Sequence, residues 1–291
     1  MGSWMPKLIR WGLIAAGVIV LGFALNTGRQ YLGWSPFDER PETRSERLAE
    51  HWRIVRPEGP GPFPAAILLS GCDGVRDNMD YWADLFVETG RATLIVDSYT
   101  PRGLDELESW RLVCAGQALS GAERAGDIAV ALDALSEMED VSDDVVLFGA
   151  SHGGWTVMEF VTHAAAGEIP PGLERWPEEP EALLDRVSAL VLLYPYCGVL
   201  NGSTPDQWKT VPPTLFVLAE SDTIVSTPDC IALAEALQPK TAAVEIAILS
   251  GAGHGFDQRE KSALSTLAFD AEQRDRAREI VLEFLTANDL R

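Results

Sequence analysis

The sequence has few basic residues: 23 lysines and arginines stand against 44 aspartates and glutamates, which gives a formal net charge of −21. A surface with this surplus of negative charge repels phosphate backbones, so the composition argues against nucleic acid as a partner. It also disfavours adhesion to anionic lipid headgroups. The simplest interpretation of the acidity is a well-solvated protein surface.

Other signatures are missing as well. The sequence contains no internal repeat, no long low-complexity segment and no Gly-rich phosphate loop. Its four histidines do not have metal-ligand spacing such as His-x-x-x-His, and we therefore expect no metal and no cofactor. The 46% hydrophobic content is sufficient for a substantial core, which excludes a disordered chain.

One long hydrophobic run is present, at the N-terminus. Lys7 and Arg10 precede an uncharged apolar run over residues 11–25, and a basic start before such a run is typical of an export signal. The run is short against the roughly 20 residues that cross a bilayer. We expect residues 1–28 to be a cleaved signal or a retained membrane anchor with its basic end in the cytoplasm, and the remainder to be extracytoplasmic. A buried helix of the soluble domain is the alternative.

The remaining sequence divides into a linker and one domain. Residues 29–46 are polar and lack periodicity, so they are expected to be a linker, and residues 47–291 to be a catalytic domain. In that domain, continuous apolar runs alternate with segments of helical spacing, a pattern that predicts an α/β fold with a mostly parallel central sheet and helices on both faces. An acidic, Pro-containing insertion over residues 167–184 is expected to form a small cap or a surface loop. The apolar runs include Ala65 to Leu69, Ala92 to Val96 and Val187 to Leu193, and the helical segments include Met79 to Thr89 and Ala122 to Met138.

The chain is organised around a short motif that follows one of these runs. The apolar residues before Gly149 lead into Gly-Ala-Ser-His-Gly, and a helical pattern begins immediately after it. This is the strand–turn–helix context of a nucleophile elbow, in which the central serine is exposed at the sheet edge. Gly149 and Gly153 provide the near absence of side chain that such a tight turn requires. Ser151 is therefore the candidate nucleophile.

Two later strand-like runs end in the partners that a serine nucleophile needs. Asp222 follows the run ending at Ala219, and His254 follows the run ending at Leu249, so the order Ser…Asp…His is that of α/β-hydrolase triads. An imidazole can take the serine proton, and a carboxylate fixes its tautomer and stabilises the imidazolium. The alternatives for the acid are Glu220, Asp229 and Asp257, and the other histidines are His51, His152 and His163.

Five motifs of the sequence belong together. They are Gly149 to Gly154, Ser70 to Gly74, Asp97 to Gly103, Tyr194 to Gly198 and Ala252 to Phe256. Together they resemble the dienelactone hydrolase family of α/β hydrolases, over roughly residues 48 to 290. The resemblance implies an α/β-hydrolase fold and a small-molecule ester or lactone as substrate. The dienelactone-cleaving enzymes of this family carry a cysteine nucleophile where this chain has Ser151, which favours a more ordinary carboxylic ester.

The resemblance also suggests how a developing oxyanion would be held. The N–H of His152, the residue after the nucleophile, is one expected donor, aided by the positive end of the following helix. Ser70-Gly71-Cys72 stands in the place of the family's His-Gly-x, so the backbone of Cys72 is the second expected donor. A plain Gly-rich turn is the alternative interpretation of that loop.

The four cysteines fit the same architecture. They all follow strands at the expected catalytic edge, and we predict disulfides between Cys72 and Cys114 and between Cys197 and Cys230. The first would hold the oxyanion loop and the second the loop of the acid. Four reduced, partly buried thiols are the alternative.

Four further residues are candidates for substrate binding. Arg102 could bind a substrate carboxylate or pair with one of the many acids, while Tyr99, Trp155 and Tyr196 could form an apolar pocket or part of the core. The reaction itself is expected to be ester or lactone hydrolysis through an acyl-enzyme. A peptidase or amidase on the same scaffold, and a non-catalytic binding module with a vestigial triad, are the alternatives.

Overall fold

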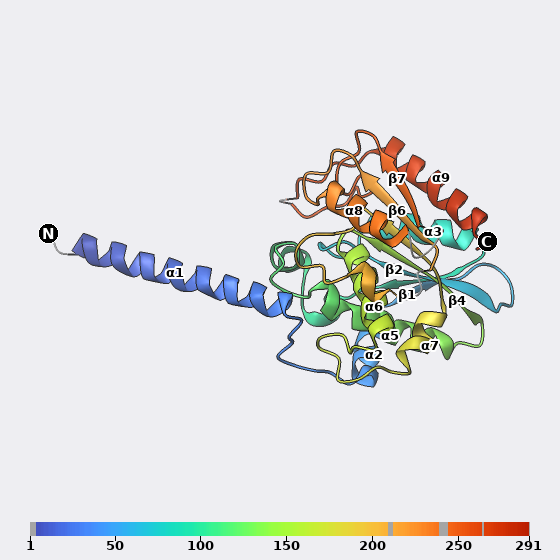
Figure 1. Ribbon diagram of the computed structural model, residues 1–291, viewed down its shortest axis with the longest axis horizontal. Coiled ribbons are helices and arrows are strands. Elements are labelled where there is room, and N and C mark those ends of the chain that lie inside the picture. The colour runs from blue at the N-terminus through green and yellow to red at the C-terminus, as the bar shows by residue number, and fades with distance from the viewer. Residues whose placement is uncertain (1–3, 209–211, 239–243, 264, 291) are drawn as a thin grey trace.

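A computed structural model describes residues 4–208, 212–238, 244–263 and 265–290. The described residues form one seven-stranded sheet in the order β1-β3-β2-β4-β5-β6-β7 (Figure 1). β1 pairs antiparallel with β3, and every other neighbouring pair is parallel. This confirms the predicted mostly parallel α/β architecture. The strands are β1 (Arg53–Val55), β2 (Phe63–Leu69), β3 (Ala92–Val96), β4 (Val141–Ala150), β5 (Val187–Leu193), β6 (Thr214–Ala219) and β7 (Val244–Leu249).

Helices cover both faces of the sheet. Successive residues of a strand point to opposite faces, so β2 directs Ile67 towards α5 and α6, and directs Leu68 towards α3 and α9. The central strands are buried throughout because they are covered on both sides, which explains their continuous apolar sequence. The helices of the domain are α2 (Pro41–Ala49), α3 (Asp77–Glu88), α4 (Glu106–Glu108), α5 (Gly121–Ser136), α6 (His152–Ala166), α7 (Pro180–Asp185), α8 (Thr227–Leu237) and α9 (Ala271–Ala287), with short helices η1 (Thr100–Arg102), η2 (Ser109–Val113) and η3 (Pro205–Gln207).

Local sequence signals set several of these boundaries. The side chain of Ser120 accepts a hydrogen bond from the N–H of Glu123, and the Glu123 carboxylate accepts one from the N–H of Ser120, so a complete capping box starts α5. Gly90 follows α3 with a φ of +85°, a left-handed conformation that ends a helix at little cost for glycine.

The region before the domain differs from the predicted linker. α2 lies partly inside residues 29–46, with Arg44 and Leu48 buried and its contacts made against α5. The guanidinium of Arg44 pairs with Asp127 of α5 and also donates to the carbonyl of Gly172. These partners lie far along the chain, so the polar sequence of the segment gave no sign that it would dock.

The first helix, α1 (Trp4–Tyr31), projects away from the domain (Figure 1). Its segment Ile9–Tyr31 has a mean hydropathy of 1.7 and is long and apolar enough to cross a membrane, with no part of the most apolar window buried against the protein. The helix therefore continues beyond the apolar run that the sequence defines and is not a buried helix of the soluble domain.

Candidate active site

Ser151 stands at the sharp turn between β4 and α6. Its φ of +53° and ψ of −111° form a strained backbone conformation that non-glycine residues rarely adopt. A Cβ at Gly149 would lie 2.4 Å from the backbone of Gly153, and a Cβ at Gly153 would lie 2.1 Å from the carbonyl oxygen of Leu69. The two glycines are therefore required by crowding, as the motif predicts.

A chain of hydrogen bonds joins the three residues that the sequence picks out. Ser151 Oγ lies 2.8 Å from His254 Nε2, and His254 Nδ1 lies 2.7 Å from Asp222 Oδ2. The other carboxylate oxygen of Asp222 accepts hydrogen bonds from the N–H groups of Ile224 and Val225. Burial raises the pKa of Asp222, but the hydrogen bond and charge of His254 and these N–H donors outweigh it and leave that pKa below its usual value. The carboxylate is thus fixed in its ionised form.

The alternative acids lie elsewhere. The Glu220 carboxylate accepts hydrogen bonds from Ser250 and from the N–H of Gly251, which ties the loop after β6 to the loop after β7. Asp229 lies in the first turn of α8, and Asp257 is buried against Tyr194 and Trp82. Of the four candidate acids, Asp222 is the one bonded to His254.

Histidines other than His254 also take no part in this chain of bonds. His51 is exposed in the turn before β1, and His163 lies on α6 with its Nε2 3.9 Å from Glu159. The ring of His152 is buried and its Nε2 lies 2.9 Å from the carbonyl oxygen of Leu119. His254, the histidine that the sequence favours as the base, is therefore the one that contacts Ser151.

Two backbone N–H groups beside Ser151 have no hydrogen-bond partner among the described residues. One belongs to His152, the first residue of the 15-residue helix α6, and the other to Cys72 in the loop after β2. The preceding Gly71 approaches closely, since a Cβ there would lie 3.7 Å from the Cβ of Ser151. Unpaired donors next to a nucleophile are the arrangement that an oxyanion requires.

A buried arginine fixes the loop that carries one of these donors. The guanidinium of Arg124 donates to the carbonyl of Ser70 at 2.7 Å and to the hydroxyl of Tyr99 at 2.9 Å. The Tyr99 hydroxyl in turn donates to the carbonyl of Gly71 at 2.7 Å. Arg124 also lies 3.3 Å from Nδ1 of His152, and the same group therefore contacts both the loop of Cys72 and the residue that carries the other unpaired N–H. Sequence reasoning missed this role, for which position 124 gives no local signal.

Two of the predicted substrate-binding residues are corrected by this arrangement. Tyr99 is 1% exposed, packs in an apolar cluster and holds the loop after β2 through its hydroxyl. Arg102 forms a two-point ion pair with Asp127 of α5, at 2.7 and 2.9 Å, and also donates to the carbonyl of Ser98. Asp127 neutralises its positive charge. Arg102 therefore pairs with an acid of the protein, which was the alternative to binding a substrate carboxylate.

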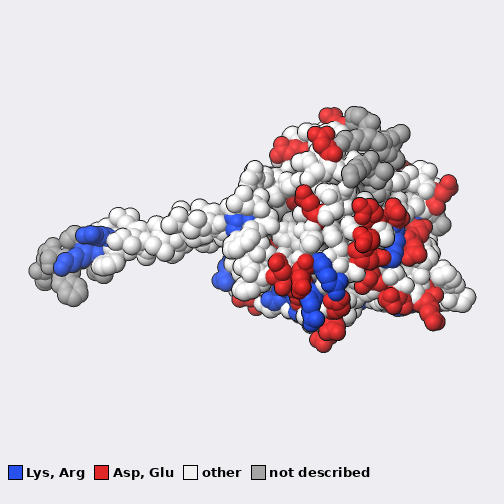
Figure 2. Space-filling model, turned by 60° about the horizontal axis from the view of Figure 1, so that its bottom comes forward, with Lys and Arg blue, Asp and Glu red and all other residues white. Residues whose placement is uncertain are grey.

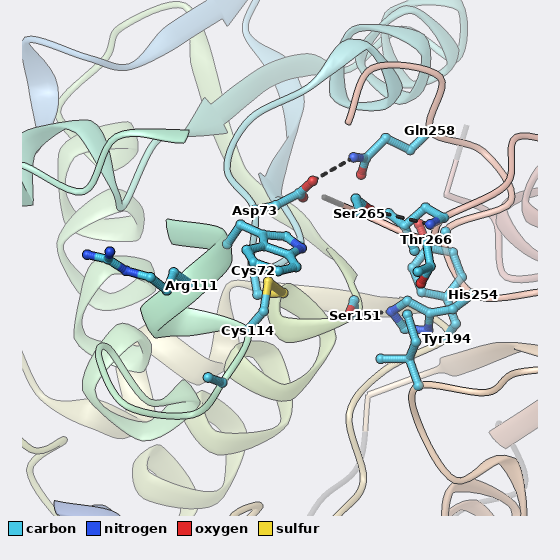
Figure 3. A pocket seen from close by; sticks show the side chains of 16 residues that line it. Cys72, Asp73, Arg111, Cys114, Ser151, Tyr194, His254, Gln258, Ser265 and Thr266 are labelled. Atoms are coloured by element: carbon cyan, nitrogen blue, oxygen red, sulfur yellow. Dashed lines mark hydrogen bonds between the residues drawn. A yellow bond between two sulfur atoms is a disulfide. The ribbon is translucent and has the colours of Figure 1, made fainter. Parts of the chain in front are cut away.

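Ser151 lies where two cavities meet. The larger has a volume of about 370 Å³ and is mostly apolar, with Trp110, Ile224 and Leu267 in its wall. Figure 3 shows Ser151 and His254 turned towards each other in this cavity, with Asp73 and Gln258 joined by a hydrogen bond of 3.0 Å. Burial raises the pKa of Asp73. This residue belongs to the motif Ser70 to Gly74 but was not among the predicted site residues.

The smaller cavity, of about 200 Å³, lies on the side of α6. Trp155, Tyr196 and Leu200 contribute to its wall, and the rings of Trp155 and Tyr196 lie 5.0 Å apart. Trp155 and Tyr196 thus line the site, as the sequence suggested. The nucleophile has one apolar space on each side.

Both predicted disulfides are confirmed. Cys72 pairs with Cys114 and Cys197 pairs with Cys230. The first links the loop after β2 to the segment after η2, and the second links the loop after β5 to α8. Among the described residues, no group of histidine, cysteine and acidic side chains is arranged to hold a metal.

Residues 181–288 match the dienelactone hydrolase family. None of the curated proteins compared has a significantly similar sequence.

Solved structures share the fold of this chain. Esterase 2 of Thermogutta terrifontis phosphoramylated by tabun superposes with a TM-score of 0.59 at 17% identity, over 82% of this chain and 89% of that chain. Its butyrate-bound form gives 0.57 at 18% identity over the same shares. A protein of Klebsiella pneumoniae subsp. pneumoniae, provisionally assigned as a dienelactone hydrolase, gives 0.61 at 16% identity over 81% of this chain and 92% of that chain. These matches confirm the predicted fold, and the family match confirms the predicted resemblance.

Proposed function

We propose that this chain, which has the α/β-hydrolase fold and matches the dienelactone hydrolase family over residues 181–288, is a carboxylic ester hydrolase acting through an acyl-enzyme on Ser151. The observation that carries the proposal is the hydrogen-bonded chain from Ser151 through His254 to Asp222. It ends at the junction of two apolar cavities, which suits a substrate with an acyl group on one side of its carbonyl and an alcohol group on the other.

The first half of the reaction forms the acyl-enzyme. Ser151 Oγ attacks the ester carbonyl carbon while His254 Nε2 takes its proton, and Asp222 holds the other ring nitrogen and stabilises the imidazolium. The N–H groups of Cys72 and His152 hold the oxyanion, and each such donor can be worth about 3 kcal/mol in the transition state. His254 then gives its proton to the departing alcohol oxygen as the carbon–oxygen bond breaks.

The second half releases the acid. Water takes the place of the alcohol, His254 removes one of its protons, and the hydroxyl attacks the acyl carbon. The second tetrahedral intermediate collapses, the bond to Ser151 Oγ breaks, and His254 returns the proton to the serine. The fixed ionised state of Asp222 suits it to both halves, because the carboxylate has no proton of its own to exchange.

The charges around the cavities favour a substrate ester without a carboxylate. Arg102 is paired with Asp127, and the side chain of Arg111 points away from the larger cavity (Figure 3). The acid that does face this cavity is Asp73. A neutral ester therefore fits better than a dienelactone, whose carboxylate would face Asp73 and, among the described lining residues, an arginine turned away from the cavity.

The N-terminal helix and the disulfides support a place outside the cytoplasm. Disulfides persist in oxidising compartments, and Lys7 and Arg10 before the apolar segment suit a cytoplasmic N-terminus. We place the domain on the extracytoplasmic side of a membrane on these grounds.

Covalent labelling of the full-length protein in detergent tests the enzyme function. Paraoxon phosphorylates the Thermogutta esterase, and we expect it to phosphorylate Ser151 here and to stop hydrolysis of p-nitrophenyl butyrate. Ser151→Ala should lose both labelling and hydrolysis. Ser265→Ala, which removes another serine of the same cavity, should keep both. Labelling that persists in Ser151→Ala, or a wild-type protein without hydrolysis, would refute the proposal.

A further inference from the structure

The base of α1 is attached to the segment that follows the cavity-lining residues Ala115 and Gly116. Asn26 Nδ2 donates to the carbonyl of Gln117 at 2.7 Å, and Gln117 Nε2 donates to Thr27 Oγ1 at 3.1 Å. Arg29 forms an ion pair of 3.1 Å with Glu123 of α5. Three side chains from one turn of α1 thus contact two residues of the domain, Gln117 before α5 and Glu123 in its first turn, which is more than a flexible tether requires.

The contact lies next to the opening of both cavities. We define the cavity mouth as the exposed residues Cys114, Ala115 and Ile224, each of which lines both cavities. Gln117 follows Ala115 by two positions. Figure 1 shows α1 ending beside the segment that precedes α5, at the edge of the sheet where α5 and α6 begin. The helix therefore leaves the domain from the catalytic edge.

Burial along α1 changes abruptly where the docked part begins. Residues 9–25 are all exposed, whereas Asn26 and Thr27 are half-buried and Gln30 is buried. In Figure 2 the helix is a rod on which lysine and arginine appear only towards its two ends. An apolar rod with charged ends matches the thickness and polarity of a bilayer. The bilayer surface would thus lie close to residue 25, directly beside the docked turn.

Several exposed apolar side chains lie next to α1 or next to cavity residues along the chain. Outside α1, nine large apolar side chains of the described residues are exposed. Three of them follow α1, and three others are cavity residues or lie near one in the sequence. Ile224 lines both cavities, Val199 precedes the lining residue Leu200, and Leu107 lies three positions before the lining residue Trp110. Apolar side chains on a water-facing surface mark a contact with an apolar partner. The three that follow α1 are Leu32, Trp34 and Phe37.

We infer that α1 is a retained anchor whose docked base holds the cavity mouth at the bilayer surface, so that the substrate is an ester dissolved in the membrane. This inference rests on the proposed ester hydrolysis and specifies its substrate class. If α1 were removed as a signal, the contacts of Asn26 and Arg29 with the domain would be lost and would have no role in the mature protein. The apolar cavities receive the acyl chain and alcohol as the ester leaves the lipid. The acidic remainder of the surface stays in water.

The test compares two esters with the same leaving group on the full-length protein in phosphatidylcholine vesicles. p-Nitrophenyl butyrate reaches the site through water, whereas p-nitrophenyl palmitate stays in the bilayer. In Asn26→Ala/Arg29→Ala, which releases the base of α1, the butyrate rate should stay within about twofold and the palmitate rate should fall at least about fivefold, because the mouth no longer stays near the lipid. Asn288→Ala/Arg278→Ala, the same changes on α9, should leave both rates unchanged.

The outcomes separate this inference from the enzyme function. A wild-type protein inactive on both esters refutes ester hydrolysis itself. If butyrate is cleaved but the palmitate rate of the released variant falls no further than its butyrate rate, the membrane-facing mouth is refuted. Mass spectrometry of the protein from its native membrane should find the peptide that contains residues 11–29. A mature chain that starts at or beyond Asn26 would overturn the retained anchor.

Discussion

The hydroxyl of Tyr99 links the catalytic loop to a fixed charge. It donates to the carbonyl of Gly71, one residue before the Cys72 donor, and accepts from Arg124, which is itself fully buried. Burial raises the pKa of Tyr99 to about 12, so the phenol keeps its proton and remains a donor. The Tyr99 side chain thereby sets the position of the loop that carries the proposed oxyanion donor, Cys72 N–H.

Replacing this hydroxyl should affect the transition state more than substrate binding. We expect Tyr99→Phe to lower kcat by roughly tenfold and to change KM little, because a misplaced donor weakens contact with the oxyanion and not with the ground-state ester. Steady-state kinetics with p-nitrophenyl butyrate measures both constants. Tyr81→Phe removes an exposed hydroxyl that donates to Asp275 and should change neither. A rise in KM at constant kcat would contradict the positioning role.

The ring of His152 gives a second prediction at the residue scale, on stability. Burial, together with the charge of Arg124, lowers the pKa of His152 to about 3, against 6.5 for a free histidine. Between pH 6.5 and pH 3 the His152 ring is protonated in the unfolded chain but neutral in the folded protein. The free energy of unfolding therefore falls as the pH falls from 6.5 towards 3. The loss due to this one ring should reach about 2 kcal/mol at pH 5 relative to pH 7.5.

Urea unfolding at the two pH values measures this difference. In His152→Gln the part of the decrease that comes from the ring should disappear, whatever the stability of the variant at pH 7.5. His51→Gln, at an exposed position, should keep the wild-type decrease. An unchanged decrease in His152→Gln would show that the ring is protonated in the folded protein.

At the scale of elements, strand ends made the proposed catalytic residues predictable. Parallel strands present their C-terminal ends at one edge, so residues following β4, β6 and β7 meet there although 103 positions separate Ser151 from His254. Crowding at the elbow added a second local signal. The sequence therefore contained enough information to bring together Ser151, Asp222 and His254.

Tertiary ion pairs account for what the sequence did not predict. Whether Arg102 faces a substrate or an acid depends on Asp127, which lies 25 positions away on α5 and is one of many acids. Helix α2 was not predicted for the same reason. In the sequence, Arg44 is typical of a polar linker, and its burial depends on Asp127 and the carbonyl of Gly172, which are distant along the chain. Periodicity reports the apolar face of an element and gives no information on such polar partners.

The two disulfides allow a test of which loop matters for catalysis. They close loops with sequence separations of 42 and 33 residues, so chain entropy predicts similar stabilisation, about 4 kcal/mol each. Cys72 carries a proposed oxyanion donor and lines both cavities, whereas Cys197 and Cys230 line neither of them. We expect Cys72→Ser/Cys114→Ser and Cys197→Ser/Cys230→Ser to lose comparable stability, and the first pair to lose the larger share of kcat. Kinetics and chemical unfolding of both variants decide this, and equal losses of kcat would argue against a special role for the Cys72 loop.

At the scale of the whole molecule, the surface carries the acid surplus, because several arginines are paired inside the protein. Arg44, Arg91, Arg102 and Arg124 are held in buried or half-buried contacts with carboxylates and carbonyls. Among the described residues, many exposed acids therefore stand outside the ion pairs, and like charges repel where they are one helical turn apart, as at the exposed Glu279 and Glu283 of α9. This repulsion opposes the compact state.

Salt should therefore stabilise the folded protein. Raising NaCl from about 0.02 M to about 0.5 M shortens the screening length well below 10 Å, and weakened repulsion should raise the free energy of unfolding by about 1 kcal/mol, or Tm by about 2–4 °C. Exposed ion pairs such as Arg53–Asp80 lose strength in salt, but each contributes at most about 1 kcal/mol and they are outnumbered by unpaired acids. Glu283→Gln should raise Tm in low salt and reduce the increment, because it removes one repelling charge from α9. Calorimetry of both proteins across the salt series gives the two slopes, and a Tm that falls with salt would mean that attraction between surface charges, and not repulsion, dominates this acidic molecule.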